Sequence, residues 1–449
     1  MYIRNREELT SHGETEGREA VVDIIEQALL AADPYSATTN LVQLNRDILT
    51  VGDLRYDLSR RGRIYVLGAG KATFPIAKAL EEILRERIAD GIVIVKEGQE
   101  GTLRRIKKRE ASHPLPNEQG FMAAQEMKSL AEAAQEGDIV FCAITGGSSA
   151  LAPLPAPGIT IEEKRKVHEL LLNSGATIRE INAVRKHLSR IKGGRLALSI
   201  FPAEIINLTV SDVTEDPLDY ITGPTVPDTS TFADAIQVLN NYDLLGKIPE
   251  SAREYLLDAT AEMENPKDFS DRPVHDFVIV KSSVPCEAAS NRARGLGFTP
   301  MILTSTFEGE SKEVSYVFTS IAREVKTHGR PLAAPCAVIA SGETTVTLCG
   351  EYGKGGANQE FALSAALQLD GRNGVVIAAI DTDGTDGPTE LAGGIVDSST
   401  TERARQKGLD LRHRLRSHDA TTALTELGDA IRTGHTGTNV NDLYLMLVS

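Results

Sequence analysis

The sequence predicts an α/β protein with two α/β domains, the first a Rossmann-like parallel sheet covered by helices and the second a smaller α/β domain. Two observations carry this prediction. Apolar runs of strand length alternate with amphipathic helical stretches along almost the whole chain. These runs are uninterrupted by polar residues, which is typical of parallel strands that are buried on both faces.

The predicted elements follow one another in a regular order. A helix is predicted over residues 17–32, where apolar side chains recur at helical spacing. The first strand, 63–68, ends at a glycine, and a helical stretch follows over 71–86. Further buried strands are predicted at 91–95, 138–145, 203–212, 275–280, 337–341 and 374–381.

A polar, proline-containing stretch at residues 261–273 is the best candidate for a linker. The alternation of strands and helices resumes after it. The two domains are therefore expected to span residues 1–265 and 266–449.

The composition excludes several classes of protein. A net charge of −15 argues against nucleic-acid binding, which requires a broad excess of Lys and Arg. No apolar run reaches the roughly 18 residues of a membrane helix, so no membrane partner is expected. The four cysteines show no CxxC pairing, which favours reduced thiols and a cytoplasmic protein.

Gly70 and Lys71 stand in a GAGKA segment directly after the first predicted strand. Closely spaced glycines let a backbone approach an anion, and the next helix offers free N–H groups. The segment is neither a Walker A loop nor a dinucleotide fingerprint, because Thr73 replaces the third glycine. It predicts a site for a phosphoryl or carboxylate group; a tight turn with a solvated lysine is the alternative.

A second glycine-rich turn, Gly146, Gly147, Ser148 and Ser149, follows the predicted strand at 138–145. Such a turn forms a concave nest of N–H groups, to which the two hydroxyls add donors. A serine nucleophile competes with this interpretation, but GGSSA is not GxSxG and no histidine–acid pair can be assigned to it. Anion binding is favoured, and a plain turn is the other alternative.

Five Lys or Arg lie within residues 185–195, which is unusual in so acidic a chain. The segment is predicted to be one helix with an apolar face of Val184, Leu188 and Ile191 and a polar stripe of Asn182, Arg185, Ser189 and Lys192. A planar guanidinium suits bidentate binding of a carboxylate or phosphate, so Arg185 is a candidate binding residue. A solvated basic face is the alternative, and His187 is expected to be structural.

Aspartates follow other predicted strands. Asp212 ends the strand at 203–212 and is a candidate base or metal ligand, because ligands bind beyond the carboxyl ends of such strands. Asp383 and Asp386 follow the strand at 374–381, in an oxygen-rich segment suited to Mg²⁺. Structural turns are the alternative for all three residues.

Three more candidate binding residues lie in the second predicted domain. Glu343 follows the strand at 337–341, while Lys354 and Asn358 lie in and after a segment with four glycines in residues 350–356. So many glycines predict a mobile loop that closes over a ligand. The histidines show no zinc-ligand spacing.

Taken together, these segments resemble the glycerate 2-kinase family, whose C-terminal region is known as the MOFRL domain. Some members carry the older label hydroxypyruvate reductase. The resemblance spans almost the whole chain and rests on the ordered motifs GAGKA, TGGSSAL, INAVRKHLSRIKGGRLA, SDVTEDPLDYITGPTVPDTST, SGETTVTL, GKGGANQEFAL, DTDGTDGPTELAGGIVD and TGTNVNDL. It implies phosphorylation of the 2-hydroxyl of D-glycerate with ATP and Mg²⁺, in a cleft between two α/β domains.

The resemblance also implies roles for single residues. Lys71 would stabilise the transferring phosphoryl group, and Asp212 would orient or deprotonate the attacking hydroxyl. Arg185 and the glycine-serine loop, including Gly146, would hold a carboxylate or phosphate. Mg²⁺ would lie near Asp383 and Asp386.

One departure from the family pattern concerns Ala357. The family reads GGRNQE where this chain reads GGANQE. The family arginine is expected to reach the active site, and its loss should cost several kcal/mol of transition-state stabilisation. The sequence therefore predicts a kinase with impaired activity.

Two other functions stay open on the sequence alone. An NAD(P)H-dependent hydroxypyruvate reductase would need a complete GxGxxG and an acidic residue about 20 positions on. A non-catalytic protein that binds a sugar acid or a nucleotide is the other. The expected partners are D-glycerate and ATP, and the expected assembly is a monomer or homodimer.

Overall fold

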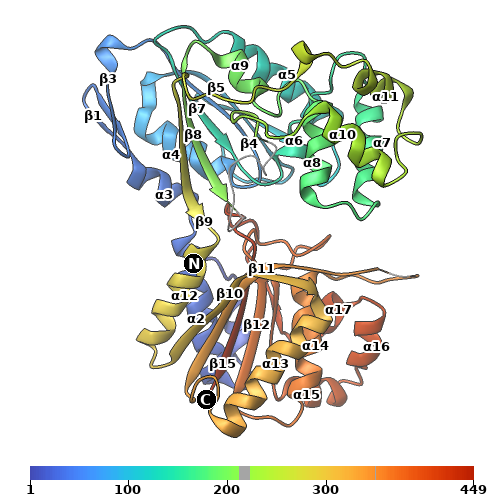
Figure 1. Ribbon diagram of the computed structural model, residues 1–449. Helices are drawn as coiled ribbons and strands as arrows, with labels where there is room; N and C mark the ends of the chain where they lie inside the picture. The colour runs from blue at the N-terminus through green and yellow to red at the C-terminus, as the bar shows by residue number, and fades with distance from the viewer. Residues whose placement is uncertain (212–222, 349) are drawn as a thin grey trace. The chain divides into compact units, whose positions relative to one another are not determined.

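The structure is a computed structural model that describes residues 1–211, 223–348 and 350–449. The chain divides into two compact units. One, the Rossmann-like unit, is Pro34–Ile279; the other, the mixed-sheet unit, combines Met1–Asp33 with Val280–Ser449. Both are built from strands and helices, which confirms the predicted α/β class (Figure 1).

A six-stranded sheet forms the centre of the Rossmann-like unit, in the order β6-β5-β4-β7-β8-β9. The neighbouring strands from β6 to β8 run parallel, as predicted. The strands are β4 (Ile64–Ala69), β5 (Ile88–Lys96), β6 (Lys107–Ala111), β7 (Ile139–Ile144), β8 (Glu204–Ser211) and β9 (Val274–Lys281). The chain builds outward from β4 to β6 and then returns to place β7 beside β4, so the order reverses between β4 and β7.

Helices and a small antiparallel sheet complete this unit. The helices are α3 (Pro34–Leu41), α4 (Thr73–Leu84), α5 (Glu118–Glu132), α6 (Ser148–Leu151), α7 (Ile161–Leu172), α8 (Ile178–His187), α9 (Arg195–Ile200), α10 (Phe232–Asn241) and α11 (Glu250–Leu257). The small sheet is β1 (Val42–Asn45), β2 (Ile48–Val51) and β3 (Leu54–Asp57).

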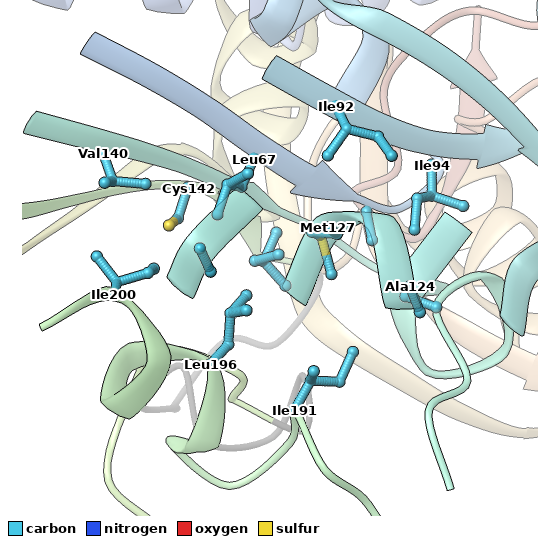
Figure 2. Packing of buried hydrophobic residues seen from close by; sticks show 14 of the residues in the cluster. Leu67, Ile92, Ile94, Ala124, Met127, Val140, Cys142, Ile191, Leu196 and Ile200 are labelled. Atoms are coloured by element: carbon cyan, nitrogen blue, oxygen red, sulfur yellow. The ribbon is translucent and has the colours of Figure 1, made fainter. Parts of the chain in front are cut away.

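One face of the parallel sheet is covered by α5 and α9 (Figure 2). Leu67 of β4 and Cys142 of β7 lie among side chains such as Met127 of α5 and Leu196 of α9. Every residue of β4 and β7 is buried. Burial on both faces explains why these strands read as uninterrupted apolar runs.

The boundary between the units lies at Ile279/Val280 rather than near residue 265. The stretch predicted as a linker is held to the Rossmann-like unit by Asn265. The Asn265 amide donates to Asp228 (2.7 Å) and accepts from Arg195 (2.5 Å). Strand β9, which follows this stretch, still belongs to the first sheet.

The mixed-sheet unit has a six-stranded sheet in the order β10-β11-β15-β12-β13-β14, in which only the pair β10–β11 is parallel. Its strands are β10 (Thr299–Glu310), β11 (Cys336–Thr345), β12 (Val375–Asp381), β13 (Gly393–Asp397), β14 (Ala430–Ile431) and β15 (Asp442–Val448). Its helices are α1 (Arg6–Thr10), α2 (Thr15–Ala31), α12 (Ser283–Gly295), α13 (Ser311–His328), α14 (Ala357–Leu369), α15 (Thr400–Gln406), α16 (Leu411–Arg416) and α17 (Ala420–Leu427).

Helices cover both faces of this second sheet. Alternate residues of β11 face opposite ways: Ile339 packs with α2 and α12, and Val338 packs with α13 and α14. The first 33 residues therefore complete the core of the mixed-sheet unit, although the sequence analysis assigned them to the first domain.

Candidate functional site

Two loops meet beyond the carboxyl ends of β4 and β7, where the strand order reverses. The Lys71 N–H donates to the Gly146 carbonyl (2.9 Å). The Ala72 N–H donates to the Thr145 hydroxyl (3.1 Å). Ligands of open α/β sheets bind in the crevice at such a switch point. The two glycine-rich turns that the sequence singles out thus belong to one candidate site.

Glycine is required in both turns. Gly70 has φ +141°, and a Cβ there would lie 2.0 Å from the Thr145 hydroxyl oxygen. Gly147 has φ +86°, and its Cβ would lie 3.2 Å from Cγ of Lys71 and 3.3 Å from Cδ2 of His113. A side chain would therefore push the loops apart and strain both turns. Sequence reasoning missed His113, although it follows β6, the third parallel strand, at the same edge of the sheet.

Ser148 and Ser149 begin the short helix α6, directly after Gly147. Both hydroxyl oxygens are buried, and neither has a hydrogen-bond partner among the described residues. A buried polar group without a partner is costly, so such hydroxyls in a concave site point to a ligand. This fits the predicted anion-binding turn.

The helix predicted to run through the basic segment ends earlier than expected. Helix α8 stops at His187, and Ser189 pairs with Pro155 in an isolated bridge. The Arg190 N–H donates to the Leu154 carbonyl (3.0 Å), and that carbonyl also accepts from the Ser189 hydroxyl. Contacts with a distant segment thus end a helix whose apolar spacing continues.

Other members of the basic segment are structural. Lys186 forms a buried ion pair with Asp228 (3.1 Å). His187 donates from Nδ1 to the Ala183 carbonyl (2.7 Å), and the centre of its ring lies 4.6 Å from that of Phe232. The prediction that His187 is structural agrees with these contacts.

Arg185 lies in a buried group of basic side chains. Its Nε is buried without a partner among the described residues, and burial lowers its pKa to about 10. Lys164, His168 and Lys192 are at most 2% exposed. The pKa of Lys164 is lowered to about 7 by burial and then by Arg185, and that of Lys192 is also lowered by burial and by the neighbouring cations.

Sequence reasoning missed Lys164 and His168. Helix α7 begins with a capping box of Thr160 and Glu163, which places Lys164 and His168 one turn apart on its buried side. No motif distinguishes Lys164 from its exposed neighbour Lys166.

Asp212, the candidate base, lies outside the described residues.

The mixed-sheet unit contains a cavity of about 310 Å³ beside the amino terminus of α14. Of the candidate residues in this unit, Glu343, Asn358 and Asp386 line the cavity, and so does Ala357. Lys354 and Asp383 are not among its lining residues. The described lining also contains Glu360, Asp381 and Asp442, and no Lys or Arg. The cavity is therefore strongly acidic.

Asp386 caps α14 from a distant loop. Its Oδ1 accepts from the Asn358 N–H (3.1 Å), and its Oδ2 accepts from the Gln359 N–H (2.8 Å). The Gln359 side-chain amide also donates to Oδ2 (3.0 Å). Burial raises the pKa of Asp386 to about 6. A Cβ at Gly356 would lie 2.3 Å from Cγ of Asp386, so this approach requires glycine.

Both predicted magnesium ligands accept hydrogen bonds from the protein in this arrangement. Both oxygens of Asp386 are engaged by α14, and Asp383 accepts from the N–H and hydroxyl of Thr385 (2.8 and 2.7 Å). In the part of the chain that is described, no three His, Cys, Asp or Glu side chains group as a metal site. A magnesium site at Asp383 and Asp386 stays a prediction.

Asn358 links Asp386 to a second buried carboxylate. Its amide donates to Asp442 (2.8 Å), which also accepts from the Tyr444 hydroxyl (2.8 Å). Burial raises the pKa of Asp442 well above its usual range, and Asp386 and Glu343 raise it further. Asp442 begins the last strand, β15; it lies within the TGTNVNDL motif, but the sequence analysis assigned it no role.

Glu360 contributes a further buried carboxylate to the cavity. His418 contacts it at 2.6 Å, and its other oxygen, Oε2, is buried without a partner among the described residues. Burial raises the pKa of Glu360 as well. The cavity therefore gathers carboxylates, and among its described lining residues His418 is the one basic group.

Within the described ranges, every helix is too short or too polar to cross a bilayer. Family models match two parts of the chain: a domain of unknown function, DUF4147, over residues 20–257, and the MOFRL family over residues 336–442.

Full-length relatives are similar to this chain in sequence and in fold. A glycerate 2-kinase of Pyrococcus horikoshii is 43% identical, covering 96% of this chain and 97% of its own. A D-glycerate 2-kinase of Thermotoga maritima is 39% identical, and the match covers 96% of this chain and 98% of that protein. A crystal structure of a glycerate kinase from Thermotoga maritima matches with a TM-score of 0.81 and 38% identity, over 96% of this chain and 99% of that one.

A putative hydroxypyruvate reductase of Agrobacterium vitis, 38% identical over 96% of this chain and 94% of its own, carries the older label. On these similarities, together with the two glycine-rich turns at the switch point, the chain belongs to the glycerate 2-kinase family.

Proposed function

We propose that the protein is an ATP-dependent kinase that phosphorylates the 2-hydroxyl of D-glycerate and releases 2-phospho-D-glycerate and ADP. One observation carries the proposal. The Lys71 loop and the Gly146–Ser149 loop are hydrogen-bonded to each other at the switch point of a parallel sheet. Relatives that cover nearly the whole chain are named glycerate 2-kinases.

Phosphoryl transfer needs little covalent chemistry from a protein and depends on positioning and charge neutralisation. The substrate hydroxyl oxygen attacks the γ-phosphorus of ATP, the bond to the oxygen of ADP breaks, and the hydroxyl loses its proton. Lys71 would neutralise charge on the transferring group. Ser148, Ser149 and Arg185 would bind a carboxylate or phosphate.

Other roles follow from the family resemblance. Asp212 would orient the hydroxyl or accept its proton. We infer that Gly70, Glu343, Lys354 and Asn358 contribute to ligand binding, and that Mg²⁺ accompanies ATP. No step is assigned to a metal held by Asp383 and Asp386, because both oxygens of Asp386 are engaged.

The product identifies the reaction. With ATP and D-glycerate, we expect ADP release and a ³¹P NMR doublet, because phosphorus on the 2-oxygen couples to a single proton. A triplet would indicate phosphorylation of the 3-hydroxyl and would contradict the proposed position. NADH oxidation with hydroxypyruvate, without ADP release from ATP and D-glycerate, would support a reductase instead.

A further inference from the structure

Lys164 is a buried cation that the proposed reaction does not yet use. Its side chain is 2% exposed, and its Nζ donates to the Leu188 carbonyl (2.8 Å). No carboxylate among the described residues pairs with it, and within that part of the chain its Nζ makes no other hydrogen bond. An ammonium group has three donors, so its bonding capacity is not used up.

The groups around Lys164 are basic. Arg185 approaches from α8, Lys192 from the turn before α9, and His168 from the next turn of α7 itself. Arg185 forms no hydrogen bond or ion pair with the described residues, and its Nε is buried. Burial, followed by the charge of Arg185, lowers the pKa of His168 to about 2, so this ring is neutral at neutral pH.

Such an arrangement is costly without a counter-ion. Burying a charge without an opposite partner lowers stability, and two like charges in one buried region add repulsion. Perturbed groups of this kind concentrate at functional sites. A purely structural role, holding the Leu188 carbonyl, would use only one of the three donors of the ammonium group.

The backbone connects these cations to the switch-point loops. Helix α6, which begins with Ser148 and Ser149, leads into Leu154 and Ala156. The Ala156 N–H donates to the Leu188 carbonyl (3.1 Å), the same carbonyl that accepts from Lys164. The chain leaving the serine turn is thus bonded to the chain leaving Arg185.

We propose that Lys164 is a further substrate-binding residue, which together with Arg185 binds an anionic oxygen group, either the carboxylate of the hydroxy acid or a phosphoryl group of the nucleotide. This inference rests on the proposed function. It assigns Lys164 to ligand binding rather than to holding the fold.

Two lysines of the same helix give a matched test. Lys164→Met removes the buried charge, and Lys166→Met removes an exposed charge from α7. Thermal unfolding is measured without ligand and with inorganic phosphate, D-glycerate or ADP. A ligand that binds the folded state raises its melting temperature.

We expect Lys164→Met to match or exceed the wild-type melting temperature without ligand and to lose most of the anion-dependent rise. Lys166→Met should behave as wild type. Loss of the response to D-glycerate would assign the carboxylate, and loss of the response to ADP would assign a phosphoryl group. The KM of Lys164→Met for that substrate should rise roughly tenfold or more. Lys164→Arg should show a smaller rise in KM.

Several results would overturn the assignment of Lys164. A lower melting temperature with an intact anion response would make it a structural donor to Leu188. A wild-type protein that responds to none of the three anions would also exclude the site. Kinase activity with an unchanged KM in Lys164→Met would overturn this inference alone, whereas an anion response without turnover in the wild type would overturn only the proposed function.

Discussion

At the scale of single residues, Ala357 stands where the family resemblance predicts an arginine. It lies in the first turn of α14 and lines a cavity with carboxylates from Glu343, Glu360 and Asp442. The described lining contains no Lys or Arg. An arginine at this position would have opposite charges beside it and would supply the cation that the cavity lacks.

Introducing an arginine at position 357 should increase the activity of the protein. We expect Ala357→Arg to raise kcat with D-glycerate on the order of 100-fold, because donors placed at a developing charge contribute that much or more. Ala357→Met is the matched control, since it adds comparable length without charge. Equal rates for both variants and the wild type would show that this position does not reach the reacting groups.

The buried charge of Lys164 makes stability depend on pH. Its pKa is about 7 in the folded protein against an ordinary value of 10.5. Between these values the unfolded chain binds a proton that the folded protein does not, so wild-type stability should rise with pH. The slope relative to Lys164→Met is at most about 1.4 kcal/mol per pH unit.

This pH dependence can be measured by urea denaturation of wild type and Lys164→Met between pH 7 and pH 10. The difference in stability should shrink as the pH rises and should be constant below pH 7, where both states are protonated. A difference that does not change with pH would show that Lys164 keeps its ordinary pKa.

Substitution of Asp386 distinguishes a role in capping α14 from a role as a metal ligand. Asp386→Ala leaves two N–H groups of α14 without acceptors and should cost about 1–3 kcal/mol of stability. The magnesium concentration required for half-maximal activity should stay unchanged. If Asp383 and Asp386 share an ion, Asp383→Ala and Asp386→Ala would both raise that concentration.

At the scale of elements, helix α2 is held to the mixed-sheet unit by a buried ion network. Arg18 is fully buried, and its guanidinium donates to Asp397 (2.5 Å) and Asp429 (2.8 Å). The pKa of Asp397 is lowered to about 2, because Arg18 and hydrogen bonds more than offset its burial. These partners follow Arg18 by hundreds of residues, so no local pattern predicts the contact.

Arg18→Met should destabilise the protein by about 3–5 kcal/mol, because it leaves two carboxylates buried without this cation. Arg6→Met, which removes a partly exposed pair with Glu19 (3.1 Å), should cost less than about 1 kcal/mol. Far-UV circular dichroism during denaturation reports both, since the chain has no tryptophan. Equal effects would contradict the role given to α2.

The elements also show which features the sequence could predict. Strands β4 and β7 were predictable, because burial on both faces requires an uninterrupted apolar run. The turns after them were predictable too, because glycines that follow such strands mark the switch point. The end of α8 was not predictable, because Leu188 and Ile191 continue its apolar spacing, whereas hydrogen bonds donated to the Leu154 carbonyl by the following residues end the helix.

The missed site residues share one physical cause. Lys164 and Asp442 are ionisable residues, and such residues are most often exposed to solvent. Their burial is decided by packing against segments distant in the chain. The same applies to Asp386, whose helix cap joins residues 28 positions apart.

At the scale of the whole molecule, the net charge is −15. The candidate site in the Rossmann-like unit nevertheless contains basic side chains. The charge disfavours polyanionic partners. The Rossmann-like unit buries Lys164 and Lys192 next to the partly buried Arg185. A small anionic substrate can therefore find basic groups in a chain whose net charge is negative.

The central claim is that the paired loops at the switch point transfer a phosphoryl group to D-glycerate. The most direct measurement compares D-glycerate-dependent ADP release by the wild type and by Lys71→Met, in the Ala357→Arg background where turnover is expected to be highest. We predict release above the rate without D-glycerate, a loss on the order of 100-fold in Lys71→Met, and an unchanged melting temperature. Release that does not depend on D-glycerate, or that survives the loss of Lys71, would contradict this account.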